Sequence, residues 1–247
     1  MKKRNLGYLV TATVGITLLS GCNLVSTPKA IQTQVATQTV DPTGLQAVLA
    51  SIDTMKGLSS FEVKAQIQEA AGKFNRQVDY YGSILLPHTV YVDETIGGND
   101  YLVYQDGTFS YYRDNGHWYP MQPLTALKPW DSLRKLLTTN PPKVVDQLPT
   151  QTVVSWLCNV YQFTTSASPV IGGSSLTSTL GKTPSKALYT VWVDATDGKL
   201  RQIEVQSTIG VPEIGTASIS STELIFGENA INSLPVPQDL VSQVEKP

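Results

Sequence analysis

Two cysteines are the first residues of this 247-residue chain to examine for chemistry, and Cys22 has the more informative neighbours. It directly follows Leu19, Ser20 and Gly21. Small residues before a cysteine leave room for a peptidase to approach the backbone. The thiol can carry a diacylglyceryl group, after which cleavage would make Cys22 the first residue of the mature protein. Cys22 is therefore the candidate lipidation site.

The segment before Cys22 has the order of an export signal. Met1–Arg4 carries three basic residues and no acidic one, and Leu6–Leu19 is an uncharged apolar stretch of 14 residues. A transmembrane helix needs about 20 such residues. Together with Leu19–Cys22, the segment resembles the bacterial lipobox. We therefore expect residues 1–21 to be a lipoprotein signal peptide. The alternative is an ordinary signal peptide with a chance cysteine.

This arrangement predicts an extracytoplasmic protein that is anchored to the cell membrane by acyl chains, such as palmitate, on Cys22. Residues 23–41 are rich in Thr, Gln, Ser, Val and Ala and show no sustained periodicity. With the lipidated cysteine they form a predicted flexible tether, 22–41. The remaining residues, 42–247, are long enough to form a single domain with its own core.

The rest of the chain contains no recognisable catalytic motif. Cys158 lies in the apolar run Val153–Val160, so we expect a buried thiol. His88 and His117 lie beside turns, and we expect both rings at the surface. Neither a metalloprotease motif, a phosphate-binding loop nor a nucleophile elbow is present. We therefore predict no enzymatic activity and no cofactor.

The remaining candidates for chemistry are acidic residues near turns. Asp93 with Glu94, and Asp194 with Asp197, are expected to be solvated, and a calcium site is the alternative. A net charge of −2 leaves no basic surface for nucleic acid. The charged fraction of 15% excludes a coiled coil, and the hydrophobic fraction of 41% argues against wholesale disorder.

The first predicted elements of the domain are a helix and a strand. The helix ends at Gly57, and its apolar residues recur at helical spacing: Leu45, Val48, Leu49, Ile52 and Met55. The strand follows at Phe61–Ile67 with a strict two-residue period. Its polar half, Glu62, Lys64, Gln66 and Gln68, should meet water. Its apolar half is the candidate cavity lining: Phe61, Val63, Ala65 and Ile67.

More strands follow, separated mostly by short turns that predict antiparallel pairing of neighbours. They are expected at Gln77–Leu86, Thr89–Ile96, Tyr101–Gln105, Thr108–Arg113, His117–Met121, Thr152–Thr164, Ala187–Asp194, Leu200–Ser207 and Ala217–Phe226. Leucines between Pro123 and Pro141 predict a turn and a short helix, and Ser166–Ser185 is expected to be a long loop. These elements predict an α+β fold: a strongly curved antiparallel sheet of nine or ten strands, with two short helices covering its concave face.

The order of these features resembles the LolA/LppX–LprG superfamily of lipid-binding lipoproteins over residues 42–240. The best local match is the hairpin Trp192–Leu200, which has the pattern W-V-D-x-x-D-G-K-L. The hairpin Asn115–Tyr119, the leucine-rich insert Pro123–Thr138 and the terminal Pro235–Pro237 occur in the same order. The resemblance implies an open half-barrel whose apolar hollow takes acyl chains, with helices acting as a lid.

The predicted function is therefore that of a membrane-anchored extracytoplasmic lipoprotein that binds or carries a lipid or acyl ligand. A branch of the same superfamily regulates envelope-stress proteases. The alternative is accordingly a non-enzymatic envelope sensor, or a protein-interaction lipoprotein that regulates a membrane-protein partner.

Overall fold

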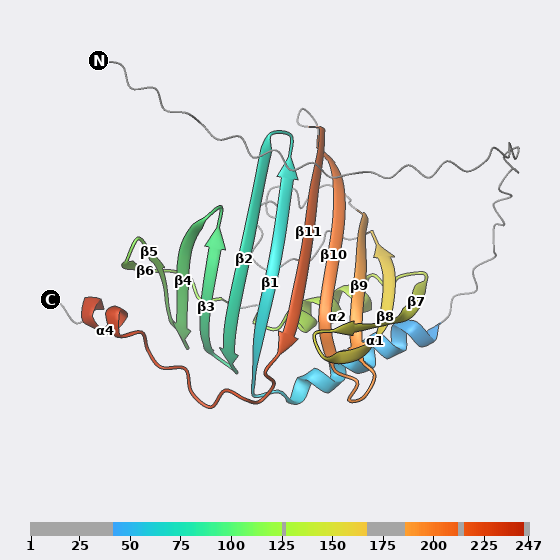
Figure 1. Cartoon of the computed structure of the whole chain (residues 1–247), viewed down its shortest axis with the longest axis horizontal. Coiled ribbons are helices and arrows are strands. Elements are labelled where there is room, and N and C mark those ends of the chain that lie inside the picture. Colours follow the sequence, from blue (N-terminus) through green and yellow to red (C-terminus); the bar gives the residue numbers. More distant parts are fainter. Residues whose placement is uncertain (1–41, 125–126, 167–185, 212–214, 245–247) are drawn as a thin grey trace, which may run out of the picture. The chain divides into compact units, whose positions relative to one another are not determined.

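An antiparallel sheet of eleven strands organises the described residues (Figure 1). The structure is a computed structural model that describes residues 42–124, 127–166, 186–211 and 215–244. In chain order the strands are β1 (Ser60–Ala71), β2 (Phe74–Leu85), β3 (Thr89–Ile96), β4 (Asn99–Asp106), β5 (Phe109–Asp114), β6 (His117–Pro120), β7 (Val145–Val153), β8 (Trp156–Thr165), β9 (Lys186–Asp194), β10 (Leu200–Val211) and β11 (Gly215–Phe226).

The sheet consists of two meanders that are joined in the middle. Strands β1 to β6 pair in chain order, as do strands β7 to β11. The first and last strands, β1 and β11, pair antiparallel and connect the two halves. As a result β6 and β7 are the edges, and the described sheet is open. Pro120 in β6 and Pro149 in β7 limit further pairing, because proline lacks the backbone N–H that a neighbouring strand would need.

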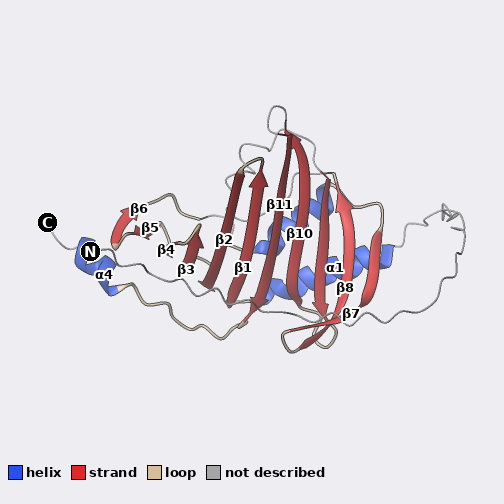
Figure 2. Cartoon of the chain, turned by 45° about the horizontal axis from the view of Figure 1, so that its top comes forward, coloured by secondary structure: helices blue, strands red, loops and turns tan. Residues whose placement is uncertain are grey.

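Two helices pack against one face of the sheet (Figure 2). Helix α1 (Pro42–Thr54) continues into the 3-10 turn η1 (Met55–Gly57), as the spacing of its apolar residues predicts. Because those residues share one side of the helix, Val48 and Ile52 are fully buried in the same core as β1. Helix α2 (Pro129–Thr139) lies in the chain between the two edge strands, β6 and β7.

Helix α2 is held to both the sheet and α1. It begins with Pro129, a residue that suits the first turn because its missing N–H would have no partner there. The ring of Trp130 lies 4.8 Å from the ring of Phe61 on β1, measured between centroids. Arg134 forms an ion pair with Asp53 at the end of α1. Helix α2 is therefore connected both to α1 and to the sheet.

A third helix among the described residues, α4 (Gln238–Val244), was not expected from the sequence. It lies at the β4–β6 end of the sheet (Figure 1). Its Leu240 packs with Tyr104 of β4 and Trp118 of β6. Tyr104 follows Val103, which shares a row with Val92 and Gly82 on the face toward α1 and α2. Because strand side chains alternate, α4 packs on the opposite face.

The expected single strand Thr152–Thr164 is wrong, because two strands occupy this part of the chain. Strand β7 ends at Val153, a turn follows at Val154 and Ser155, and β8 begins at Trp156. Val154 has φ +55°, a left-handed conformation that β-branched residues rarely adopt. The turn was missed because it contains neither Gly nor Asn, the residues that normally mark such a conformation.

The other sequence expectations agree with the structure more closely. Strand β3 has its expected bounds, and the strands expected around it are present with longer or slightly shifted ends. The sheet has eleven strands, one more than the ten segments expected, because β7 and β8 form separate strands. The loop expected at Ser166–Ser185 lies almost wholly outside the described residues. An open sheet agrees with a half-barrel, whereas the position of the helices on a concave face stays a prediction.

Candidate functional site

The apolar residues of β1 that were predicted to line a cavity lie on the face that α1 and α2 cover. Each has an exposed fraction of 5% or less: Phe61, Val63, Ala65 and Ile67. Lys64, Gln66 and Gln68 alternate with them and are exposed on the other face. The structure thus separates the two halves of the strand as the two-residue period requires. The role of the apolar half as cavity lining stays a prediction.

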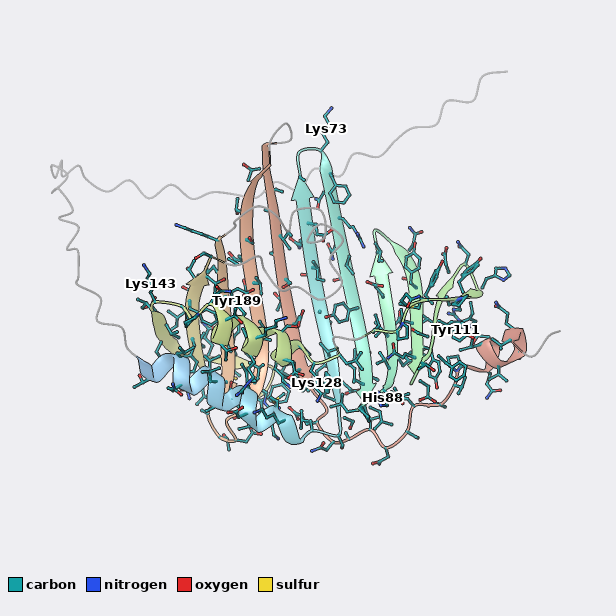
Figure 3. All side chains as sticks on the ribbon, turned by 180° about the vertical axis from the view of Figure 1, so that it is seen from behind. Lys73, His88, Tyr111, Lys128, Lys143 and Tyr189 are labelled. Atoms are coloured by element: carbon teal, nitrogen blue, oxygen red, sulfur yellow. The ribbon has the colours of Figure 1, made fainter. Side chains whose placement is uncertain are left out.

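The helices lie across one end of this face rather than along its whole length. Figure 3 shows α1 and α2 nearer the end of β2 that bears His88, while β1 and β2 extend past them to the turn that bears Lys73. Apolar side chains continue along this face in the extended part. They include Val78, Val205 and Ile219, which belong to the same core as the residues beneath the helices. The candidate site is this helix-covered face and its extension.

A row of polar side chains crosses this face. Ala65 of β1 is paired with Tyr80 of β2 on one side and with Glu223 of β11 on the other. Tyr80 is in turn paired with Glu94 of β3. Because directly paired residues point to the same face, Tyr80, Glu94 and Glu223 share the face that Phe61 occupies. We call Tyr80, Glu94 and Glu223 the polar row.

The protonation states in the polar row follow from burial. Burial, with the negative charges of Glu223 and Glu94, raises the pKa of Tyr80, so its phenol stays neutral and can donate a hydrogen bond. Burial likewise raises the pKa of Glu94, and the positive charge of Arg76 partly opposes the shift. The row therefore offers a neutral hydroxyl beside carboxylates inside an otherwise apolar surface.

One further ion pair lies nearer the Lys73 turn. Glu69 of β1 is directly paired with Arg76 of β2, and a carboxylate oxygen of Glu69 lies 3.8 Å from a guanidinium nitrogen of Arg76. Glu69 is 1% exposed. Both residues share the face of the polar row, since Glu69 continues the alternation that starts at Phe61.

These polar residues were missed from the sequence although a signal for some of them was present. Extending the two-residue period of β1 by one step places Glu69 on the apolar face. The same period in β11 places Glu223 with Ile219 and Ile225. An acidic residue at an apolar position of a strand marks a buried polar site, because an ordinary solvated carboxylate occupies the other half of the alternation.

The predicted lipidation site lies outside the described residues: Cys22 and the recognition residues Leu19, Ser20 and Gly21. Cys158 is fully buried, as expected, and its thiol donates to the Trp156 carbonyl at 3.6 Å. Burial raises the pKa of this thiol, with a further contribution from the charge of Asp194. His88 and His117 are both exposed, as expected.

The expectation that the turn acids are solvated is wrong for Asp194 and Glu94. Asp194 is 5% exposed because Arg201, which is 4% exposed, binds its carboxylate with Nε at 3.1 Å and Nη2 at 2.9 Å. Arg201 also pairs with Asp197 and Glu228. Glu94 faces the candidate site from inside β3. Within the described part of the chain, no group of three or more His, Cys, Asp or Glu side chains is arranged to hold a metal ion.

The guanidinium of Arg201 is further enclosed by an aromatic ring. Its central carbon lies 4.4 Å from the centroid of Trp156. The conspicuous pattern at Trp192–Leu200 is thus part of an internal ion-pair network, which stabilises the turn between β9 and β10. This network lies outside the candidate site.

Solved structures of other proteins share the fold of this chain. No family model and no curated protein matches the chain. LprF from Mycobacterium bovis is similar over 81% of this chain and 99% of its own, with 15% identity and a TM-score of 0.50. The LolA superfamily protein NE2245 from Nitrosomonas europaea is similar over 77% and 94%, with 11% identity and a TM-score of 0.32. The resemblance predicted from the sequence is confirmed at the level of architecture: the chain has a LolA/LppX–LprG-like fold.

Proposed function

We propose that this chain is an extracytoplasmic lipoprotein, anchored through Cys22, that binds or carries a lipid on the helix-covered face of its sheet. The observation that supports this proposal best is the apolar surface formed by that face, which runs from Phe61 to Ile67 along β1 and continues on its neighbours. Acyl chains gain free energy from burial in such surroundings, by about 0.8 kcal/mol for each methylene.

The polar row supports a defined orientation for the ligand. An acyl chain would lie along the apolar residues, and the headgroup would lie near Tyr80, Glu94 and Glu223. Binding sites for small molecules typically combine an apolar lining with a few polar groups that fix orientation. The neutral phenol of Tyr80 would donate to a headgroup oxygen, and the two carboxylates would accept from hydroxyl or amine groups.

The helices support a mechanism for entry. Helices α1 and α2 contact each other through the Asp53–Arg134 ion pair, and α2 contacts the sheet through Trp130. In the proposed mechanism the two helices act as a lid over the concave face, and the ligand enters where β1 and β2 extend beyond them. None of the helices within the described ranges is long and apolar enough to cross a membrane.

The direct test is extraction of bound lipid from protein that begins at Asn23, with an ordinary export signal in place of the leader. The described residues belong to a compact unit that does not include the leader. We expect native mass spectrometry to show a co-purifying species that organic solvent removes. A ligand-free protein that captures a membrane protein would instead support the alternative of an interaction lipoprotein.

Two neighbouring substitutions test the face that binds. Ala65→Trp would place an indole beside the polar row, whereas Lys64→Trp would place the same group on the exposed face of the same strand. We expect Ala65→Trp to reduce uptake of a fluorescent phospholipid at least fivefold and Lys64→Trp to leave it nearly unchanged. Circular dichroism checks folding, and Ala65→Leu gives a smaller obstruction if the Trp variant unfolds. Equal loss in the Trp variants at positions 64 and 65 would contradict the assigned face.

A further inference from the structure

A separate pocket of about 290 Å³ lies on the opposite side of the sheet, beneath α4. One wall is the hairpin of β4 and β5, where Tyr104 is directly paired with Tyr111, and Asp106 with Phe109. Figure 3 shows Tyr111 at the end of the sheet that α4 occupies. The other wall is aliphatic and comes from the C-terminal segment, including Leu240 and Val244 of α4.

The two walls leave large apolar groups accessible to solvent at the rim. Phe109 is 68% exposed and Val244 is 57% exposed, although both line the pocket. Tyr104, in contrast, is almost fully buried beneath Leu240 and forms the floor. The pocket thus has the rings of Tyr104 and Tyr111 on one wall, the ring of Phe109 at its rim and an aliphatic wall opposite, an arrangement that suits an apolar ligand.

A single carboxylate gives the pocket its polarity. Asp106 is the charged residue among the side chains that line it. Its Oδ1 accepts a hydrogen bond from Thr89 at 3.3 Å, and none of the ion pairs among the described residues includes Asp106. Arg113, on the same hairpin, forms an ion pair with Asp239 of α4 at 2.7 Å. Asp106 lies two residues after Tyr104 on β4 and therefore on the same face, and burial, together with the negative charge of Asp106, raises the pKa of Tyr104.

We propose that this pocket binds a quaternary ammonium group that carries an alkyl chain. The cation would lie against the rings of Tyr104, Phe109 and Tyr111, with Asp106 as its counter-ion. Aromatic faces attract such cations, and a methylated ammonium loses less hydration than a primary amine when it enters an aromatic site. The alkyl chain would extend along Leu240 and Val244. A quaternary ammonium ion can be free in solution or form the headgroup of a lipid.

The test is calorimetric titration of the protein with octyltrimethylammonium, below its micelle concentration, and with 1-octanol as the neutral chain of equal length. We expect the cation to bind at least fivefold more tightly than octanol. Asp106→Asn should remove most of that difference, by about fivefold, because it removes one charge-pair interaction in a water-exposed pocket. Phe109→Ala should weaken binding of the cation by a similar factor.

Asp100→Asn is the matched control for Asp106→Asn. Both aspartates lie on β4 and accept a hydrogen bond from a threonine of β3, at 2.8 Å for Asp100. The control should bind the cation as the unchanged protein does. Ala65→Trp should also leave this binding unchanged, which separates the pocket from the proposed lipid site on the other face. Equal affinity for cation and octanol, or no effect of Asp106→Asn, would overturn the proposal.

Vesicles distinguish the two sources of the cation. If the site takes a lipid headgroup, phosphatidylcholine vesicles should displace octyltrimethylammonium, while phosphatidylglycerol vesicles should not. If the site takes a free ion, neither vesicle should displace it. Displacement by phosphatidylglycerol as effectively as by phosphatidylcholine would contradict recognition of the ammonium group and would also overturn the proposal.

Discussion

At the scale of single residues, Arg201 shows that charged side chains of a turn motif can be buried in the protein interior rather than exposed at the surface. Its guanidinium is nearly inaccessible to water and contacts three carboxylates, of which Asp194 is the most buried. A buried charge is costly unless it is paired, so loss of one partner leaves the other in an unfavourable environment. The network therefore couples the β9–β10 turn to the stability of the whole sheet.

Asp194→Asn should reduce the free energy of unfolding by about 3 kcal/mol near neutral pH, because it leaves the buried Arg201 undercompensated. Burial alone would raise the pKa of Asp194, but the Thr196 amide and the Arg201 guanidinium outweigh burial and lower it. A carboxyl with a lowered pKa in the folded state stabilises that state above its ordinary pKa, and the contribution is lost as the pH falls through the lowered value.

The difference in free energy of unfolding between the unchanged protein and Asp194→Asn should consequently become smaller below about pH 4. Urea unfolding at a series of pH values measures this difference. Asp93→Asn is the matched control, since it removes the same charge from an exposed position. A difference that is constant from neutral to strongly acidic pH would show that ionisation of Asp194 does not contribute to stability.

The candidate site was only partly predictable at this scale. Alternation in β1 identified Phe61 and Ile67 as one face, because burial of one side of a strand imposes a two-residue period. Glu69 continues that period, yet a charged residue at the end of an apolar run resembles an ordinary strand end. The pairing of Tyr80 with Glu94 required the register of β2 and β3, which depends on turns and long-range packing rather than on composition.

At the scale of elements, the turn between β7 and β8 is the clearest case of strain in the fold. Val154 adopts φ +55° although its β-branched side chain crowds the backbone in that conformation. The side chain is 73% exposed, so little packing compensates for this cost. Strand β8 pairs with β7 on one side and with β9 at eight positions on the other. These pairings hold the turn in place.

Val154→Gly should therefore raise the free energy of unfolding by about 1 kcal/mol, since glycine adopts this conformation without steric cost. Chemical denaturation measures the change. Ser155→Gly, at the neighbouring turn position, adds backbone freedom without relieving a left-handed residue and should not stabilise the protein. If Val154→Gly were destabilising instead, the conformation at position 154 would not be the source of strain.

Helix α4 illustrates why short elements escape sequence analysis. Its seven residues contain too few turns for a helical period to be recognised, and only Leu240 is buried. Tertiary packing against Tyr104 and Trp118 holds the helix in place. Long elements with strong periods, such as α1 and β1, were predicted because their patterns reflect contacts with a single large core.

At the scale of the whole molecule, the two faces of the sheet carry different candidate binding sites. The face toward α1 and α2 carries the main core and the polar row, whereas the other face carries the pocket beneath α4 at one end. Pairing of β1 with β11 joins the two meanders between these regions. The meanders themselves were predictable from short turns, but the pairing of the first and last strands was not, since the two are far apart in sequence.

The predicted leader and tether would determine where such a protein acts. Two or more long acyl chains on Cys22 would hold the protein stably on a membrane, because each buried methylene contributes about 0.8 kcal/mol and a single chain anchors only weakly. Residues 23–41, fully extended, would span roughly 60 Å at about 3.3 Å per residue. A tether of that reach would let both faces of the sheet operate clear of the bilayer.

The anchoring prediction depends on one sulfur atom. Cys22→Ser should abolish incorporation of a palmitate analogue, and the product should retain residues 1–21, because cleavage of a lipoprotein leader follows lipidation. Cys158→Ser is the matched control, since it removes the other cysteine of the chain and should be labelled and processed normally. Gel fluorescence measures labelling, and the mass of the intact protein reports cleavage. Continued labelling of Cys22→Ser would place the acyl chains on another residue, and its cleavage after Gly21 would show that the segment acts as an ordinary export signal. Either result would contradict lipidation at Cys22.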